Sequence, residues 1–366
     1  MKSVRLFGLL FFLFTIEIAF AQSRKIINIP NIPGYQTLKC DFHLHTVFSD
    51  GTVWPTVRVQ EAWREGLDAV SITDHIEYRP HSKDITADQN RSFEIAEPLA
   101  KELKIILIRG AEITRNMPPG HLNTLFIRNA NLLDRDNVND ALREARDQGA
   151  FIIWNHPGWK AQQPDSTVWW KEHTDLHRNN MIHGIEVFNE SFCPEAMEWA
   201  IEKKLTMFGN SDEHGPSDYN EGYRPLTLVF AKSRTLGGIR EALFNRRTVV
   251  YFENTLAGES TYLNPLFFAS LEFDKEPLKL KNKESKIIFI KNNSDINYEL
   301  ELAQPGIGFD APGKVTLAAR QITTLELSGN SDEVALMKSL RIYYEVKNLK
   351  VSSKNNLVIT FSFQNN

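Results

Sequence analysis

Residues 40–52 read Cys40-Asp41-Phe42-His43-Leu44-His45-Thr46-Val47-Phe48-Ser49-Asp50-Gly51-Thr52, which sets two histidines and a carboxylate at the end of a predicted strand. Side chains at i and i+2 of a strand share a face, so His43 and His45 can both face one cation. The apolar neighbours Phe42 and Leu44 indicate a buried strand, and a buried imidazole needs a polar partner. A bound metal ion is the simplest such partner.

The same arrangement recurs along the chain. His75 follows a predicted apolar strand at 69–73, His156 follows one at 151–155, and His214 follows one at 205–210. Any one of these histidines alone is more often an ordinary loop residue, but the carboxyl ends of strands in a parallel barrel converge on one face. We therefore predict a metal centre built from nine side chains: His43, His45, Asp50, His75, Glu112, His121, His156, Asp212 and His214.

Predicted strands and helices alternate as far as Phe252, which favours a parallel sheet closed into a barrel. After Asn254 the pattern changes to short alternating strands separated by Asn, Gly, Pro and Ser, which indicates an antiparallel, immunoglobulin-like β-sandwich. We expect the sandwich to be a structural accessory. The predicted division is a signal peptide at 1–21, a polar leader at 22–37, the barrel at 38–253, a linker at 254–264 and the sandwich at 265–366.

The amino terminus has the features of a secretory signal. Lys2 and Arg5 precede an apolar run at 6–20, and the small-residue pattern Ala19-Phe20-Ala21 predicts cleavage before Gln22. The alternative, an uncleaved membrane anchor, is disfavoured by the short run and by Glu17. We therefore expect export to a periplasm or to the cell exterior, with no membrane span after cleavage.

Composition excludes few functions. The 366 residues are 42% hydrophobic and carry a formal net charge of −4 without a basic stripe, so no nucleic-acid polymer is expected as a partner. The two cysteines, Cys40 and Cys193, are predicted at different ends of separate strands. A disulfide requires close Cα atoms, so both are expected to be buried thiols.

Four motifs, in this order, resemble those of the polymerase-and-histidinol-phosphatase (PHP) superfamily: residues 40–52, 71–75, 155–158 and 211–215. The resemblance extends to about Phe252 and implies a distorted (β/α)7 barrel of the TIM type with a trinuclear metal site. It assigns one ion to His43, His45, Glu112 and Asp212, a second to Glu112, His121 and His156, and a third to Asp50, His75 and His214. No ligand of the pattern is missing, although some members have histidine where this chain has Asp50.

The resemblance further implies hydrolysis of phosphate esters. We expect a metal-bridging hydroxide at Glu112 as the nucleophile, and Asp212 or a metal-bound water as the proton donor to the leaving group. Arg115 is the predicted phosphate clamp, because guanidinium binds phosphate bidentately; an exposed loop arginine is an equally open reading. Lys160 is a second candidate, and four further side chains can either line a pocket or fill the core: Trp54, Trp159, Tyr223 and Arg224.

Six imidazoles and three carboxylates suit Zn, Mn or Fe better than Ca or Mg, so we expect three divalent ions of this kind. Three carboxylates offset about half of the charge of three such ions, which favours a phosphomonoester dianion of a small molecule as substrate. Two alternatives stay open. One is a phosphodiesterase acting on nucleotides, cyclic phosphates or lipid headgroups, and the other is a binding protein whose sandwich holds a glycan or a partner while the barrel is idle.

Overall fold

The computed structural model describes residues 23–217, 224–273 and 276–365. The predicted signal peptide and Tyr223 lie outside the described residues. Within the described part, every helix is too short or too polar to cross a lipid bilayer.

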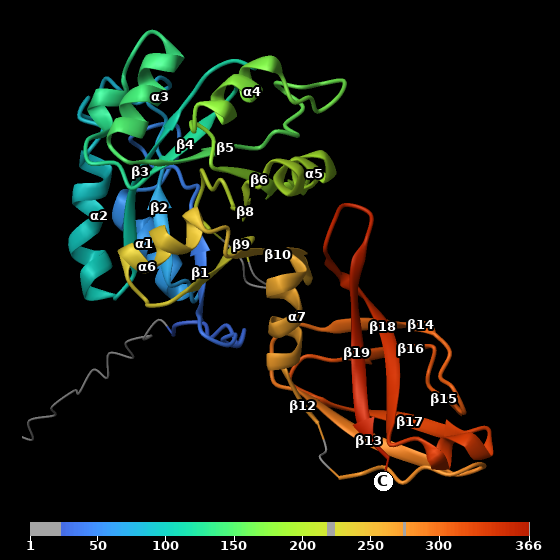
Figure 1. The fold of residues 1–366 in the computed structure, drawn as a ribbon. Helices are drawn as coiled ribbons and strands as arrows, with labels where there is room; N and C mark the ends of the chain where they lie inside the picture. The colour runs from blue at the N-terminus through green and yellow to red at the C-terminus, as the bar shows by residue number, and fades with distance from the viewer. Residues whose placement is uncertain (1–22, 218–223, 274–275, 366) are drawn as a thin grey trace, which may run out of the picture.

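The first part of the chain is an α/β barrel (Figure 1). Its strands are β1 (Gln36–Asp41), β2 (Ala69–Ile72), β3 (Ile106–Ile113), β4 (Leu122–Leu125), β5 (Phe151–Trp154), β6 (Gly184–Asn189), β8 (Thr206–Gly209), β9 (Leu226–Ala231) and β10 (Thr248–Phe252), with a two-residue β7 (Ser191–Phe192). Its helices are α1 (Pro55–Arg64), α2 (Arg91–Glu102), α3 (Val138–Asp147), α4 (Lys171–Arg178), α5 (Pro194–Lys203) and α6 (Leu236–Phe244).

The sheet is parallel from β1 through β2 to β3 and again from β5 through β6 to β8, as the alternating pattern predicts. It departs from that pattern at β4, which is antiparallel to both β3 and β5, and at β9, which is antiparallel to β1 and β10. The connection from β3 to β4 contains no helix, and parallel neighbours need a long crossover, so β4 can only return antiparallel.

Side-chain hydrogen bonds join β8 to β9 and β10. The Thr227 hydroxyl of β9 donates to the Gly209 carbonyl at 3.0 Å and accepts from the Gly209 amide at 3.1 Å. The Thr248 hydroxyl of β10 donates to the Met207 carbonyl at 2.8 Å. These bonds bring the last strands of the barrel together around a buried interior.

Burial and helix ends follow from the sequence. All residues of β2, β4, β5, β8, β9 and β10 are buried, as expected for strands packed on both faces. Helix α3 begins where the Asn137 side chain accepts a hydrogen bond from the Asn139 amide, and it buries Ala141, Leu142 and Ala145 at helical spacing. Gly149 follows it at φ +81°, the left-handed conformation that ends many helices.

The second part is a β-sandwich. One sheet contains β14 (Tyr298–Gln304), β16 (Lys314–Leu317), β18 (Ser339–Lys350) and β19 (Asn356–Gln364). The other contains β12 (Leu271–Phe273), β13 (Ser285–Asn292), β15 (Phe309–Asp310) and β17 (Ile322–Gly329). Burial alternates along β13, with Ile288 and Ile290 in the core and Ile287 and Phe289 exposed. A short 3-10 helix, Asp332–Leu336, precedes β18, and another, Ala130–Leu133, precedes α3.

The predicted linker at 254–264 is wrong as to its local structure. The chain there forms β11 (Thr255–Gly258) and begins α7 (Ser260–Ala269), which is followed directly by the short strand β12. The helix buries Leu263, Leu266 and Phe267, which lie at i, i+3 and i+4, a spacing masked in the sequence by the polar start of the segment and by Pro265.

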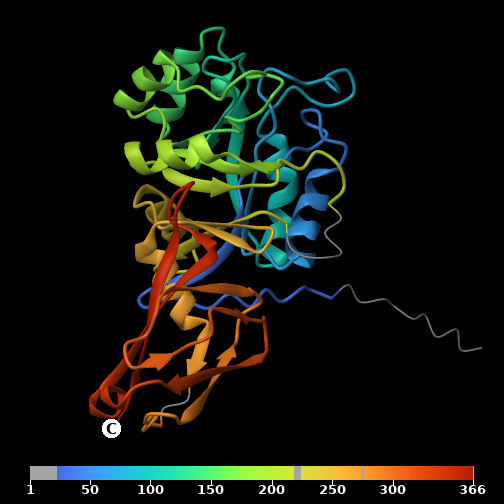
Figure 2. The ribbon, with the colours of Figure 1, turned by 90° about the vertical axis from the view of Figure 1, so that its right-hand side faces the viewer.

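The two parts share a sheet. Strand β11 pairs parallel with β18, with Leu256 opposite Leu349 and Ala257 opposite Lys350. Figure 1 shows α7 between the barrel and the sandwich, and Figure 2 shows the β18–β19 hairpin extending back to the barrel beside α5. At that contact the Ser353 amide donates to Glu198 of α5 at 2.8 Å.

Candidate metal centre

The nine predicted side chains converge at the carboxyl end of the barrel strands. Their ligand atoms form four overlapping groups, in each of which all the atoms lie within 4.8 Å of one another. The groups are His45, Asp50, His75 and His214; His43, His45 and Asp212; His43, Glu112 and His156; and His75, Glu112 and His121.

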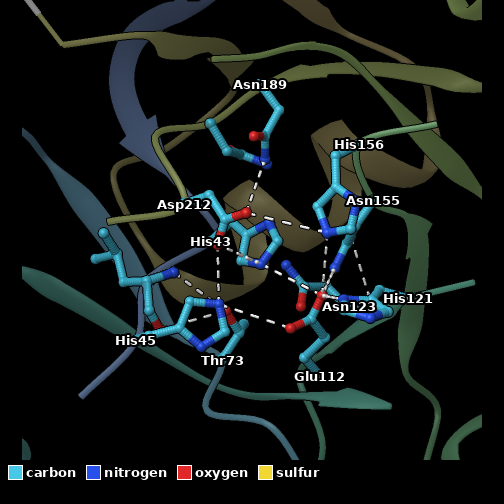
Figure 3. Close-up of polar contacts among 12 residues, drawn as sticks. His43, His45, Thr73, Glu112, His121, Asn123, Asn155, His156, Asn189 and Asp212 are labelled. Carbon is cyan, nitrogen blue, oxygen red and sulfur yellow. Dashed lines mark hydrogen bonds and ion pairs between the residues drawn. The ribbon is translucent and has the colours of Figure 1, made fainter. Parts of the chain in front are cut away.

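Glu112, at the end of β3 and fully buried, is the centre of the cluster (Figure 3). Its Oε1 lies 3.2 Å from His121 Nδ1, 3.4 Å from His43 Nε2 and 3.7 Å from His156 Nε2. The Asn155 amide donates to the same oxygen at 2.6 Å and fixes its orientation. Glu112 therefore belongs to two of the four ligand groups, those of His43 with His156 and of His75 with His121.

Asp212 forms a second focus. Its Oδ1 lies 2.9 Å from His45 Nε2 and 3.1 Å from His43 Nε2, while its Oδ2 accepts from the Asn189 amide at 3.3 Å. Asp212 has a backbone φ of +56° and His156 one of +29°. Residues other than glycine seldom adopt positive φ. Such backbone strain gathers at functional sites, where the surrounding structure holds it in place.

Asp50, His75 and His214 gather at the outer side of the cluster. Asp50 Oδ1 is 3.4 Å from His75 Nε2 and 3.3 Å from His214 Nε2. His214 is the most exposed of the nine, with 39% of its side-chain surface accessible, whereas Glu112 is fully buried. The cluster therefore runs from the barrel interior towards solvent.

Several of these buried polar atoms have no hydrogen-bond partner among the described residues: His43 Nε2, His45 Nε2, Asp50 Oδ1, Glu112 Oε2, His121 Nδ1 and Asp212 Oδ1. Buried polar atoms are almost always satisfied, so a group of them facing one another requires an occupant. Imidazole nitrogens and carboxylate oxygens in this arrangement fit divalent transition metals.

The pKa shifts of the Glu112 and Asp212 carboxyl groups agree with a metal site. Burial raises the pKa of the Glu112 and Asp212 carboxyls, but the surrounding histidines outweigh it and hold both pKa values well below their usual range. Burial lowers the pKa of His45 to about 3. Burial also lowers the pKa of His75, yet the neighbouring Glu112 and Asp50 raise it to about 10. Both carboxyls are thus ionised and available as metal ligands, whereas His75 would have to release its proton to bind an ion.

One important residue was missed by the sequence analysis. Glu186, in the middle of β6 and 1% exposed, accepts from His43 Nδ1 at 2.9 Å and from the Asn210 amide at 2.8 Å on Oε1. Its Oε2 accepts from the His156 backbone amide at 2.7 Å and from the Asn189 side chain at 2.9 Å. A carboxylate cannot donate, so His43 carries its proton on Nδ1 and turns the Nε2 lone pair towards the cluster. A charged residue within the apolar strand Gly184–Asn189 was the available signal.

Asp74 accepts hydrogen bonds from the loop that carries Asp50. Asp74 accepts from the Thr46 amide at 2.6 Å and from the Ser49 hydroxyl at 3.0 Å. Gly51 is required for close approach, because a Cβ there would stand 2.7 Å from the carbonyl carbon of His45. The second and first motifs are therefore joined through Asp74, which is not itself a candidate ligand.

The cluster forms the floor of a cleft of about 800 Å³. Six of the nine candidate ligands line it: Asp50, His75, His121, His156, Asp212 and His214. Its other lining residues come mainly from two segments, 157–167 after β5 and 189–195 between β6 and α5. A substrate can therefore reach the cluster from solvent through this cleft.

The other predicted pocket residues separate into two groups. Trp159 and Lys160 line the cleft. Arg115 does not, because its guanidinium pairs with Glu77 and donates to the Thr114 and Arg135 carbonyls. To clamp a phosphate, Arg115 would have to leave these three partners, so the geometry gives it a structural position.

Arg224 and Trp54 also lie away from the cleft. Arg224 is 2% exposed and ion-pairs with Asp41 at 3.3 Å and Glu65 at 3.2 Å, while Trp54 packs on Phe48. Both cysteines are buried and unbonded, as predicted. His173 lies outside the cluster and stacks on Trp154 with ring centroids 3.7 Å apart.

A barrel whose strand ends gather imidazoles and carboxylates at the floor of an open cleft defines a metal-dependent hydrolase. Comparison with solved structures identifies its family. The chain is 44% identical, with a TM-score of 0.89, to a two-domain protein from Bacteroides vulgatus containing a predicted PHP-like metal-dependent phosphoesterase, over 94% of this chain and 100% of that one. The chain belongs to the PHP-like metal-dependent phosphoesterases.

Further comparisons cover the separate parts of the chain. A family model described as an Ig-like domain matches residues 271–362. A 5'-3' exoribonuclease from Haemophilus influenzae is 35% identical over 80 residues, which are 22% of this chain and 25% of that protein, so the chain matches about a quarter of its length. An uncharacterized protein from Methanocaldococcus jannaschii is 26% identical over 231 residues, 60% of this chain and 95% of that protein.

The predicted family, the fold class of barrel plus immunoglobulin-like sandwich, and the enzyme class of phosphoesterase are thus confirmed. The assignment of residues to particular ions stays a prediction. The proposed set Asp50, His75 and His214 falls within one observed group, whereas His121 and His156, expected at one ion, fall in two groups that share Glu112.

Proposed function

We propose that this chain is an exported phosphomonoesterase that hydrolyses small phosphorylated molecules at a centre of three divalent ions, Zn, Mn or Fe. The observation that carries the proposal is the convergence of nine candidate ligands, with unsatisfied buried atoms, at the floor of an open cleft. Ions in such a centre lower the pKa of water towards neutrality and polarise phosphoryl oxygens, which supplies both nucleophile and electrophile.

The residues divide this work by position. Glu112 would hold two of the ions, since it is shared by two ligand groups and oriented by the Asn155 side chain. Asp212 turns Oδ1 towards His43 and His45 and lies on the cleft. Its ionised carboxylate could accept the proton released by the attacking water and then return it to the leaving oxygen. Arg115 is not assigned a role in this scheme, because its guanidinium is held by Glu77.

The test is phosphate release from metal-reconstituted protein lacking residues 1–21. A nucleoside monophosphate and a matched phosphodiester are offered in parallel, with chelated protein as the control. We expect chelator-sensitive turnover of the monoester. Silence on both esters with metals bound would contradict the proposal and favour the binding-protein reading.

The second candidate is a phosphodiesterase, and the likeness to a 5'-3' exoribonuclease over 80 residues supports it. It predicts faster turnover of the diester than of the monoester in the same assay. Turnover of an RNA oligonucleotide, followed by the length of its products, would extend that candidate to nucleic-acid polymers.

Export is a separate part of the proposal. Its basis is the basic and apolar composition of residues 1–21. Amino-terminal sequencing of the protein from the cell envelope or medium should read from Gln22. A chain that retains Met1 in the cytoplasm would refute the export.

A further inference from the structure

The exposed charged residues at the rim of the cleft give the rim a net negative charge. Among the described lining residues outside the metal cluster and its support Glu186, the acidic ones are Asp165, Glu190 and Glu195, and Lys160 is the only basic one. All four are exposed. Asp165 comes from the segment 157–167, and Glu190 and Glu195 come from the segment 189–195. An anionic part of a ligand would therefore meet a carboxylate on either segment.

The floor is built to attract an anion once ions are bound. Its lining includes His121, which is 9% exposed and whose Nδ1 has no hydrogen-bond partner among the described residues. Three carboxylates neutralise only about half of the charge of three divalent ions, so the floor stays positive. Oriented charges of this kind raise or lower the local concentration of a charged ligand according to its sign.

Trp159 adds an apolar surface between floor and rim. Its ring centroid lies 5.6 Å from that of His121 and 5.2 Å from that of His156, and 42% of the residue is exposed. An indole so close to the candidate ligands can pack against the part of the substrate next to its phosphoryl group. Aromatic faces suit planar rings and the apolar faces of sugars, and they also attract cations.

Resting on the proposed function, we infer that the preferred substrate carries one phosphoryl group on an uncharged or cationic remainder, and that the rim excludes molecules with a second phosphate. The phosphoryl group binds the floor, and the remainder packs on Trp159 within reach of the Asp165, Glu190 and Glu195 carboxylates. Hydroxyl and ammonium groups satisfy those carboxylates, whereas a second phosphate is repelled by them. Sugar monophosphates and phosphorylated amino alcohols have this chemistry.

The binding test uses ligands that the enzyme cannot turn over. Butylphosphonate and butane-1,4-bisphosphonate are titrated into metal-loaded protein by calorimetry at low ionic strength. We expect the monophosphonate to bind about tenfold tighter or more, within the range of electrostatic focusing in charged clefts. Added salt should reduce the difference, because exposed charges are screened. Equal affinity, or tighter binding of the bisphosphonate, would overturn the inference.

A matched variant identifies the cause. The combined change Asp165→Asn, Glu190→Gln and Glu195→Gln removes the rim charge from exposed positions and should abolish the preference. Glu202→Gln, which removes an exposed charge from α5 away from the cleft lining, should retain it. A triple variant that still prefers the monophosphonate would refute a role for the rim carboxylates.

Turnover separates this inference from the function on which it rests. Fructose 6-phosphate should be hydrolysed with a kcat/KM about tenfold or more above that for release of the same phosphate from fructose 1,6-bisphosphate. Equal values would show a phosphatase without the proposed selectivity. If the protein hydrolyses no phosphate ester but keeps the phosphonate preference, the charge pattern stands and the proposed function fails.

Discussion

Replacing Glu186 with Gln should weaken metal binding although Glu186 is not itself a candidate ligand. All four of its neighbours donate to it: His43 Nδ1 and the Asn210 side chain to Oε1, and the His156 amide and the Asn189 side chain to Oε2. A glutamine offers one oxygen and one NH2 group, so two of these donors would face another donor.

The magnitude follows from those bonds. Loss of a partner that orients a ligating histidine costs about ten- to hundredfold in metal affinity, or about 1.4–2.7 kcal/mol. Two buried donors without acceptors cost about 1–3 kcal/mol each. We therefore expect Glu186→Gln both to weaken metal binding and to lower the free energy of unfolding by about 2–6 kcal/mol.

Calorimetric titration of chelated protein with Zn or Mn measures the affinity, and urea denaturation measures the stability. Glu202→Gln, an exposed charge removal on α5, is the control and should match the wild type in both. Asn189→Ala removes one donor to Glu186 and one to Asp212 but leaves His43 bonded to Glu186, so it should give a smaller loss of affinity. If Glu186→Gln binds metal as the wild type does and is equally stable, the orienting role is refuted.

Three further predictions concern other parts of the site. Glu112→Ala should abolish turnover and lower the number of bound ions measured by metal analysis, because two ligand groups share this carboxylate; near-normal turnover with full metal content would contradict the bridging role. Gly51→Ala should cost about 1–3 kcal/mol of stability in denaturant titration and weaken metal binding, because the new Cβ meets the His45 backbone at 2.7 Å; an unchanged Tm would show that the loop adapts. Burial lowers the pKa of His173 to about 4, so the unfolded chain binds the proton more readily than the folded one. The free energy of unfolding should therefore be highest above about pH 6.5 and should fall, by on the order of 3 kcal/mol, as the pH drops towards 4. His173→Phe keeps a ring against Trp154 and should flatten this part of the stability-against-pH curve, and an unchanged slope would assign it to other groups.

Much of the barrel and its cluster could be predicted because the residues carry local signals. An apolar run followed by histidine indicates the end of a strand, and the strand predicted at 151–155 before His156 is β5, Phe151–Trp154. Glu186 escaped notice because three of its four partners, His43, His156 and Asn210, come from three other segments of the chain, which only the folded structure brings together. Arg115 illustrates the reverse case: proximity to Glu112 in sequence suggested a phosphate clamp, but Glu77 holds its side chain.

The C-terminal part was harder to divide from the barrel. Its strands alternate clearly, as in β13, yet nothing local distinguishes β11 and α7 from a linker. Strand β11 is stabilised by pairing with β18, which lies about ninety residues further along the chain. Tertiary contacts of this kind override weak local preference.

That pairing also makes the two parts depend on each other when the protein unfolds. Strand β11 pairs with β10 on one side and with β18 on the other, so melting of the sandwich would leave β11 as an open sheet edge on the barrel. Open edges invite pairing with other chains. We therefore expect the two parts to unfold in a single cooperative transition, with the Ig-like domain covering a sheet edge of the barrel that would otherwise be open.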